Sequence, residues 1–300
     1  MNGRLQRWRL LARCGLALLA LWIWGWIPAL LIVLSSECIV LAALLLRQAG
    51  HPQPLPDLIA AAWRECWQSE LVFGYWQPFA EHREPDHLPQ GATGHAGVLL
   101  LHGFHCNRGL WTDWLRWFRK QDVACIALSL EPADGSIDAY AAPIEEAVQR
   151  LTTLTGAPPL ILAHSMGGLA ARAWWRANGQ PGRVKAFVTL GTPHAGTPMA
   201  HFAAAINARE MRPGSEWLHA LAEAELGRPL PPLHCLSSSN DQIVFPTSTT
   251  QLAGAAQLLE LPATGHLGLV FHPEVRALVA RLLGKTAEDQ APAVNTPRRI

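Results

Sequence analysis

The sequence predicts an α/β fold, with a doubly wound, mostly parallel sheet preceded by one or two apolar N-terminal helices. Six short apolar runs, rich in branched side chains, have the composition of strands that are buried on both faces. Helical patterns such as residues 137–154 and 168–178 lie between them, and this alternation is typical of parallel βαβ units. The six runs are residues 98–101, 123–130, 160–163, 184–190, 233–237 and 256–261.

Residues 1–49 have the composition of a membrane anchor. No charged side chain occurs from Cys14 to Ser36, and this stretch alone is long enough for a bilayer span. It predicts either a single transmembrane helix or, as we favour, a hairpin of two short helices that turns near residues 25–28. Three tryptophans cluster at that turn, as in an aromatic belt: Trp22, Trp24 and Trp26.

Basic residues flank both predicted helices of the hairpin. Four arginines precede the first helix and Arg47 follows the second. The positive-inside rule therefore places both ends of the hairpin, and the domain that follows, on the cytoplasmic side of the inner membrane. A single span would instead place that domain on the opposite side. Glu37, inside the second helix, would need a polar partner.

The remaining chain divides into three parts. Residues 50–90 are a connecting segment rich in proline and aromatic residues, with helical character over 58–71 and the pattern of an added strand over 71–76. Residues 91–284 contain the predicted sheet, and within them the stretch 194–232 forms either a cap over a cleft or an extra pair of surface helices. Residues 285–300 are polar and are predicted to be a disordered tail.

Composition limits the possible partners. A chain of 300 residues, half of them hydrophobic, has room for one large domain and an appendage. The formal net charge of +1 gives no basic field, so we expect no nucleic-acid partner. The six cysteines are scattered without the spacing of a metal site or a disulfide framework. We therefore predict no cofactor and no metal.

Ser165 directly follows the apolar run 160–163 and His164, and precedes two glycines and a helical pattern. This strand–turn–helix context is the one that a nucleophile elbow requires. Small residues, Ala163 and Gly167, flank the serine at positions −2 and +2, where a tight turn has no room for bulk. The usual pattern has glycine at both positions, and Ala163 departs from it mildly. The alternative role of Ser165 is that of an ordinary helix N-cap.

Two backbone N–H groups are predicted to face this serine. Gly103 ends the run 98–101 and lets the chain turn so that the N–H of Phe104 points towards Ser165. The N–H of Met166, the next residue after the serine, is the second predicted donor. Two preorganised donors aimed at a developing oxyanion are what acyl transfer requires.

An acid and a base follow the serine in the chain. Asp241 lies in a polar loop after the run 233–237, and His266 lies in a glycine-flanked loop after the run 256–261. Where a serine nucleophile lies between a strand and a helix in this way, the acid and then the base are expected to follow it in the chain, as Asp241 and His266 follow Ser165. The catalytic residues of other protease folds occur in different orders.

Each of these assignments has an alternative. Asp241 is also a typical turn residue, and Glu131 and Asp134 are weaker acid candidates because they precede the serine. His266 competes with His272, which lies beside Pro273 and has the position of a surface or capping group. Three further histidines flank the expected cleft and are interpreted as shaping and hydrogen-bonding residues: His102, His164 and His194.

Five short strings in this order resemble the α/β-hydrolases of the bacterial triacylglycerol lipase and esterase type. The resemblance extends from about Gly97 to Leu283. It implies Ser165 as nucleophile, His266 as general base and Asp241 as the acid that orients it. The strings are His102-Gly-Phe104, His164-Ser-Met-Gly-Gly168, Leu190-Gly-Thr-Pro-His-Ala-Gly-Thr197, Asp241-Gln-Ile-Val-Phe-Pro246 and Gly265-His-Leu-Gly268.

The resemblance implies a serine hydrolase that cleaves carboxylic esters of lipids or other acyl groups through an acyl-enzyme, and the apolar N-terminal segment adds the expectation of a membrane anchor. A thioesterase, amidase or acyltransferase would use the same three residues. A non-catalytic membrane transport or scaffold protein with this fold is the alternative from another class, and the intact order of the three residues argues against it.

Overall fold

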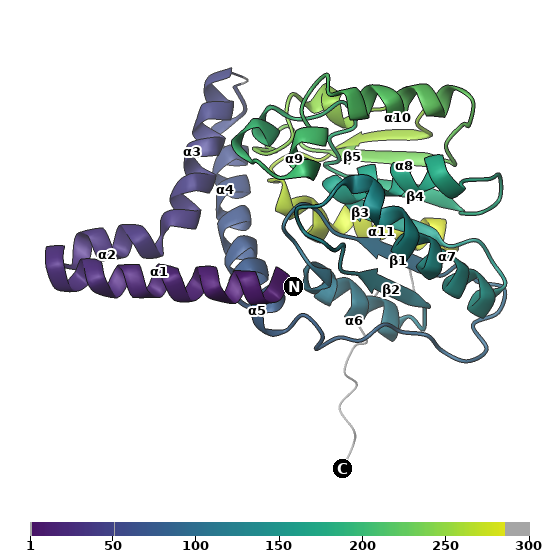
Figure 1. Ribbon diagram of the computed structural model, residues 1–300, viewed down its shortest axis with the longest axis horizontal. Helices are drawn as coiled ribbons and strands as arrows, with labels where there is room; N and C mark the ends of the chain where they lie inside the picture. The colour runs from purple at the N-terminus through teal and green to yellow at the C-terminus, as the bar shows by residue number, and fades with distance from the viewer. Residues whose placement is uncertain (1, 51, 286–300) are drawn as a thin grey trace, which may run out of the picture.

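The computed structural model describes residues 2–50 and 52–285. Six parallel strands form one sheet in the order β2-β1-β3-β4-β5-β6 (Figure 1). This confirms the predicted parallel α/β architecture, and each predicted apolar run overlaps one strand. The strands are β1 (Val98–Leu101), β2 (Cys125–Leu128), β3 (Leu160–His164), β4 (Ala186–Leu190), β5 (Leu233–Ser237) and β6 (Gln257–Glu260).

Helices cover both faces of the sheet, so the alternating side chains of each central strand enter two separate cores. Leu99 and Leu101 of β1 pack in one core with α7 (Ala141–Thr155) and α8 (Met166–Asn178). Val98 and Leu100 pack in the other core with α6 (Thr112–Lys120) and α11 (Pro273–Leu282). Burial on both faces explains why these strands are continuous apolar runs rather than alternating ones.

Short helices occupy the connections around the carboxyl ends of the strands. The stretch predicted as a cap or a surface helix pair contains the 3-10 helix η4 (Pro198–Phe202), α9 (Ile206–Glu210) and α10 (Glu216–Leu226). The other 3-10 helices are η2 (Arg108–Trp111), η3 (Ile137–Tyr140), η5 (Thr247–Thr250) and η6 (Leu267–Phe271).

Residues 2–50 form three helices: α1 (Asn2–Trp24), α2 (Trp26–Val33) and α3 (Ser35–Gly50). The chain reverses at Gly25, whose φ of 90° lies in the left-handed region, and α2 folds back along α1 (Figure 1). The first turns of α1 contact the connecting segment and the α/β domain: Gln6 is buried, and its amide donates to Gln77 Oε1 over 2.6 Å and to the carbonyl oxygen of His105 over 3.1 Å.

No single helix among the described residues is both long enough and apolar enough to cross a bilayer. Only α2 together with Glu37–Leu45 passes as a pair, with a bend of 72° between the two parts. Glu37 lies in the first turn of α3, beyond the bend.

The connecting segment is helical throughout its middle. α4 (Leu55–Ser69) continues into the π-helix η1 (Glu70–Trp76) and the short α5 (Gln77–Phe79). The prediction of an added strand over residues 71–76 is wrong, because Val72 and Trp76 point into the core from one helical face, beside β1 and α6. Of the predicted tail, residues 286–300 lie outside the described residues.

Candidate active site

Ser165 occupies a strained turn at the carboxyl end of the central strand β3. Its φ is 55° and its ψ is −128°, a conformation that non-glycine residues rarely adopt. The strand ends at His164 and α8 begins at Met166, so the whole turn consists of Ser165. Its N–H donates to the carbonyl oxygen of Leu190 over 2.8 Å, which fixes the turn to the neighbouring strand β4.

Glycines are required beside this turn because other backbone comes close. A Cβ on Gly167 would lie 2.5 Å from the carbonyl oxygen of Leu101, and one on Gly103 would lie 2.8 Å from Ser165 Cβ. Both contacts are shorter than real Cβ atoms show. The small residues that the sequence places around Ser165 therefore have a steric reason.

Asp241 and His266 form a buried pair next to this turn. His266 Nδ1 lies 2.7 Å from Asp241 Oδ2, and the carboxylate is fully buried. The other carboxylate oxygen, Oδ1, accepts hydrogen bonds from the N–H groups of Ile243 and Val244, each over 2.8 Å. These two donors fix the carboxylate so that Oδ2 faces the imidazole, which assigns the proton of neutral His266 to Nδ1.

The pKa values of the histidines around the site diverge. Burial alone would lower the pKa of His266, but the charge of Asp241, its hydrogen bond and the charge of Glu65 together raise it. Burial, and then the charge of His266, hold the pKa of His164 well below its usual value, and its ring lies 4.6 Å from the His266 ring. Burial lowers the pKa of His102 to about 4. A proton is therefore held preferentially by His266.

The structure brings Ser165 and His266 to the same cavity, although no hydrogen bond joins the Ser165 hydroxyl to His266 among the described residues. Such contacts are often long before substrate binds. Phe104 also lines the cavity, and Met166 begins α8 directly after the serine. The first N–H groups of a helix have no acceptor inside it, so the N–H of Met166 is available to a ligand.

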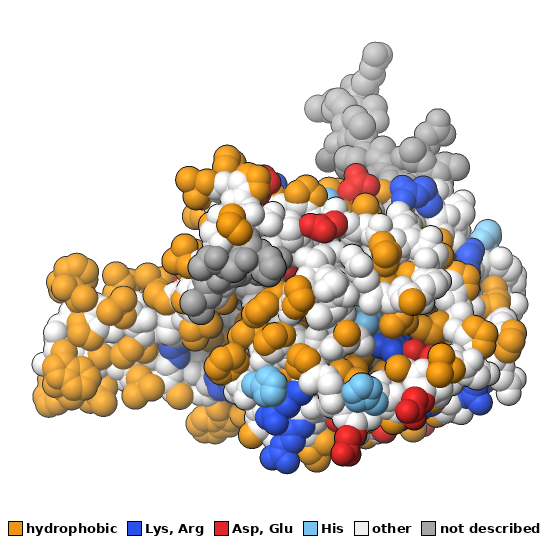
Figure 2. Space-filling model, turned by 90° about the horizontal axis from the view of Figure 1, so that it is seen from above, with side chains coloured by type: hydrophobic (Ala, Val, Ile, Leu, Met, Phe, Trp, Pro, Cys, Tyr) orange, Lys and Arg blue, Asp and Glu red, His pale blue; other side chains and the backbone are white. Residues whose placement is uncertain are grey.

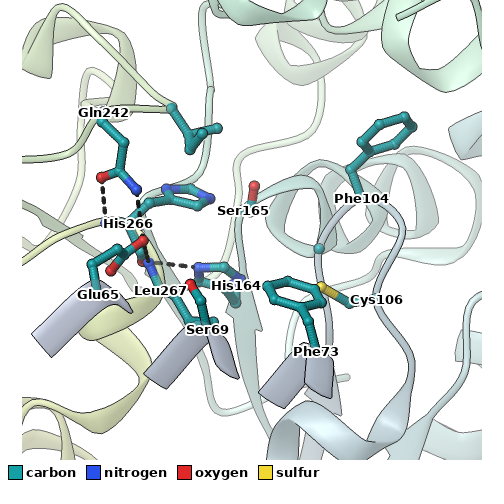
Figure 3. Close-up of a pocket in the computed structure, with 12 residues that line it drawn as sticks. Glu65, Ser69, Phe73, Phe104, Cys106, His164, Ser165, Gln242, His266 and Leu267 are labelled. Carbon is teal, nitrogen blue, oxygen red and sulfur yellow. Dashed lines mark hydrogen bonds between the residues drawn. The ribbon is translucent and has the colours of Figure 1, made fainter. Parts of the chain in front are cut away.

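Two cavities meet at Ser165. The larger, of about 260 Å³, lies between the loops of the α/β domain and the α4–η1 helix, from which Glu65, Ser69 and Phe73 approach (Figure 3). The smaller, of about 70 Å³, is bounded by residues of the 193–211 stretch such as Met199 and Met211. The first part of the predicted cap thus forms a wall beside the serine.

The second part of that stretch, α10, packs on the outside of α8. Arg172 of α8 is buried and binds both carboxylate oxygens of Glu225 on α10, over 2.7 and 2.8 Å. The same guanidinium donates to the carbonyl oxygen of His194 over 3.1 Å. Arg172 therefore joins α10 to the loop that follows β4, and His194 is hydrogen-bonded there but lines neither of the two cavities.

Glu65 is a residue of the site that the sequence did not reveal. It lies on α4, in the connecting segment, yet its carboxylate is buried beside the loop that carries His266. The only signal is an acid at helical spacing from Ser69 and Phe73, in a segment that also carries Asp57 and Glu70. That pattern does not distinguish a buried acid from a solvated one.

The alternative acids and bases lie elsewhere. Asp134 is exposed and pairs with His105 over 2.6 Å. His272 caps α11, where its Nδ1 accepts from the N–H of Glu274 over 3.2 Å. His102 accepts from the N–H of Leu130 through Nε2 and does not line either cavity. Within the described residues, no group of three or more His, Cys, Asp or Glu side chains is placed to hold a metal.

Comparison with known proteins identifies the class. Residues 98–228 match the Alpha/beta hydrolase family, so the chain carries an α/β-hydrolase family domain, as the resemblance predicted. In fold it is similar to the mature form of the lipase BlEst2 of Bacillus licheniformis, with a TM-score of 0.55, 14% identity, and coverage of 66% of this chain and 95% of that one. It is also similar to lipase B of Aspergillus fumigatus, with a TM-score of 0.55, 17% identity, and coverage of 71% and 59%. No curated protein sequence matches the chain.

Proposed function

We propose that this protein is a membrane-associated serine hydrolase that cleaves carboxylic esters with apolar acyl groups. The observation that carries the proposal is the buried Asp241–His266 pair, 2.7 Å apart, beside a serine held at positive φ at the end of the central strand. The apolar residues of the two cavities that meet at Ser165 support an apolar substrate.

The proposed reaction follows from the proton positions. With Nδ1–H donated to Asp241, the Nε2 of His266 is the free base that takes the proton of Ser165 as its Oγ attacks the carbonyl carbon. The N–H groups of Phe104 and Met166 stabilise the oxyanion. His266 then protonates the leaving alcohol, and a water molecule hydrolyses the acyl-enzyme by the reverse route.

A fluorophosphonate probe tests this chemistry, because it reacts with an activated serine and needs no knowledge of the substrate. We expect the full chain to be labelled and Ser165→Ala to lose all labelling, with nitrophenyl-ester turnover lowered by about 10⁶-fold. Ser215→Ala, which removes the N-cap of α10 away from the site, is the matched control and should still be labelled. Labelling that persists in Ser165→Ala would refute the proposal.

Membrane association is the second part of the proposal, and the distribution of exposed apolar side chains supports it. All but four of the large hydrophobic side chains that are exposed in the described residues lie between Leu5 and Phe79. Figure 2 shows hydrophobic side chains gathered over the protruding N-terminal helices, whereas the α/β domain has a mixed surface. Exposed apolar patches of this extent mark a binding surface for lipid or protein.

The dimensions of the hairpin favour insertion into one leaflet. Arg13 lies 3.6 Å from Glu70 of η1, so α1 contacts the connecting segment up to that point. Beyond it, residues 14–24 of α1 rise by about 16 Å. This is roughly half of the ~30 Å hydrocarbon core of a bilayer. A hairpin that enters and leaves by the same leaflet keeps both of its ends, and the hydrolase domain, on one side.

Fractionation and reporter fusions test the association and its side. We expect the chain to sediment with membranes, to resist extraction by high salt and to be released by detergent. A fluorescent protein that is active only in the cytoplasm should fluoresce when it is fused after Gly284. Alkaline phosphatase activity at that position would refute the cytoplasmic placement, and a fully soluble protein would refute the membrane proposal.

A further inference from the structure

Glu65 makes contacts that link the connecting helix to the loop of the predicted catalytic base. Its Oε1 accepts from Gln242 Nε2 over 2.7 Å and from the N–H of Leu267 over 2.9 Å, and its Oε2 accepts from the N–H of Gly268 over 3.0 Å. Gln242 follows Asp241, and Leu267 and Gly268 follow His266. One carboxylate therefore bridges the two loops that carry the acid and the base.

Gln242 extends this bridge to His266 itself. Its Oε1 accepts the N–H of His266 over 3.1 Å, while its Nε2 donates to Glu65 (Figure 3). The backbone of His266 is thus held on its own N–H and on the two N–H groups that follow. The three groups that bond Glu65 are Gln242 Nε2 and the N–H groups of Leu267 and Gly268. All three are donors, as expected around an ionised carboxylate.

The loop is built to receive this carboxylate. A Cβ on Gly265 would lie 2.4 Å from Glu65 Oε2, so the residue before His266 has to be glycine for the acid to fit. The contact with Glu65 therefore explains why glycine precedes His266, which the reaction of Ser165 does not explain. Glu65 is only 2% exposed to solvent, so the contacts are not a surface accident.

We infer that Glu65 is a positioning residue for His266, supplied by the helix that precedes the family domain. It fixes the loop on which the base stands and adds a second negative charge beside the imidazole. The expected change in turnover rests on the proposed function, whereas the expected change in the pKa of His266 does not. The effect on His266 itself is independent of turnover.

The charged and titratable groups that face His266 are few. Asp241 lies on its Nδ1 side, His164 packs against its ring, and Glu65 lies beneath its loop. Burial raises the pKa of Glu65, and its three donors and the charge of His266 oppose that rise. Removing the Glu65 charge should therefore lower the pKa of His266, because one of the charges that stabilise the imidazolium is lost.

The decisive experiment compares Glu65→Gln with Glu70→Gln in the full chain. Both changes remove one carboxylate from the same helical segment, but Glu70 faces Arg13 rather than His266. The protonation of His266 is followed by NMR of ring-labelled histidine, with its signal assigned by its loss in His266→Asn. We expect a lower pKa for His266 in Glu65→Gln and the wild-type value in Glu70→Gln.

Kinetics give the second readout. In Glu65→Gln we expect the plateau of kcat/KM for a nitrophenyl ester to fall by about ten-fold, through kcat rather than KM, because a loosened base is misplaced. The acidic limb of the pH profile should move to lower pH. Glu65→Asp, which keeps the charge, should leave the limb closer to its wild-type position.

A substitution in the loop of His266 tests the same contact with Glu65 by steric exclusion. Gly265→Ala should lower kcat/KM, and combining it with Glu65→Gln should add little, because both changes break one contact. Gly227→Ala is the control, since a Cβ there meets no atom within 4 Å.

The outcomes separate the two proposals. If His266 titrates identically in the wild type and in Glu65→Gln, the positioning role is wrong, whatever the activity. A loss of activity with an unmoved acidic limb would also overturn it, because that result describes general destabilisation. If the wild type is not labelled by a fluorophosphonate, the proposed function fails, while the NMR titration still decides the role of Glu65.

Discussion

Replacing Asp241 by asparagine should cost this protein almost all of its esterase activity while leaving its shape intact. The substitution is isosteric, and the amide oxygen of the new side chain can still accept from the N–H groups of Ile243 and Val244, each 2.8 Å from Oδ1 in the native protein. The amide nitrogen then occupies the place of Oδ2, 2.7 Å from His266 Nδ1. Flipping the amide would instead aim its N–H₂ at two backbone N–H groups, so this orientation is enforced.

The enforced orientation selects the wrong form of the base. An amide N–H₂ can only donate to Nδ1, so the proton of neutral His266 moves to Nε2, the nitrogen that has to accept from Ser165. We expect kcat to fall by about 10⁴-fold, as for the acid of other Ser-His-Asp triads. This corresponds to about 5.4 kcal/mol of transition-state stabilisation.

Nitrophenyl-ester turnover and the rate of fluorophosphonate labelling measure this loss, with thermal unfolding as the check on folding. Asp134→Asn is the matched control, because Asp134 is the alternative acid that follows β2 and its carboxylate is exposed beside His105. Asp241→Asn activity within ten-fold of the wild type would refute the assigned role, and so would an inactive but folded Asp134→Asn.

Two further predictions follow from the charges. Activity should fall as the pH drops through the pKa of His266, because only the neutral ring can accept a proton. That pKa lies above the ordinary histidine value because the charges of Asp241 and Glu65 outweigh burial. A kcat/KM profile without an acidic limb would contradict this prediction. Arg172→Ala should lower the free energy of unfolding by about 3–5 kcal/mol, measured by urea denaturation, because it leaves the Glu225 carboxylate without its buried partner.

The parts of this protein that could be predicted from its sequence are those set by local pattern. The central strands are buried on both faces and are therefore continuous apolar runs, whereas the edge strand β6 alternates between half-buried and exposed residues and is indicated only by the short run that contains Leu258 and Leu259. The turn at Ser165 has no room for side chains at Gly167 and Gly168, which makes it visible as a string of small residues. The helix reversal at Gly25 is likewise predictable, because glycine is the residue that adopts a φ of 90° at low cost.

Prediction fails where a pattern has two structural solutions. Residues 71–76 are a run of apolar and aromatic side chains broken only by Gly74, which fits a buried strand, but they continue α4 as a π-helix. Val72 and Trp76 are four residues apart, so they share one buried face of the helix, and they would also share one face of a strand. Tertiary contact with β1 and α6 decides between them, and the sequence of the segment alone does not contain it.

The role inferred for Glu65 is hidden from the sequence for a different reason, because the contacts join positions 177 and 203 residues apart in the chain. Each partner has a sufficient local explanation: Glu65 as a helix acid, Gln242 as a loop residue and Gly268 as a flexible neighbour of the base. Only the fold shows that a carboxylate from the connecting segment bridges the two loops that carry the acid and the base. Sites of this kind escape motif reasoning because a motif records the residues of one chain segment, whereas the electrostatic field at His266 is the sum over every segment that packs around it.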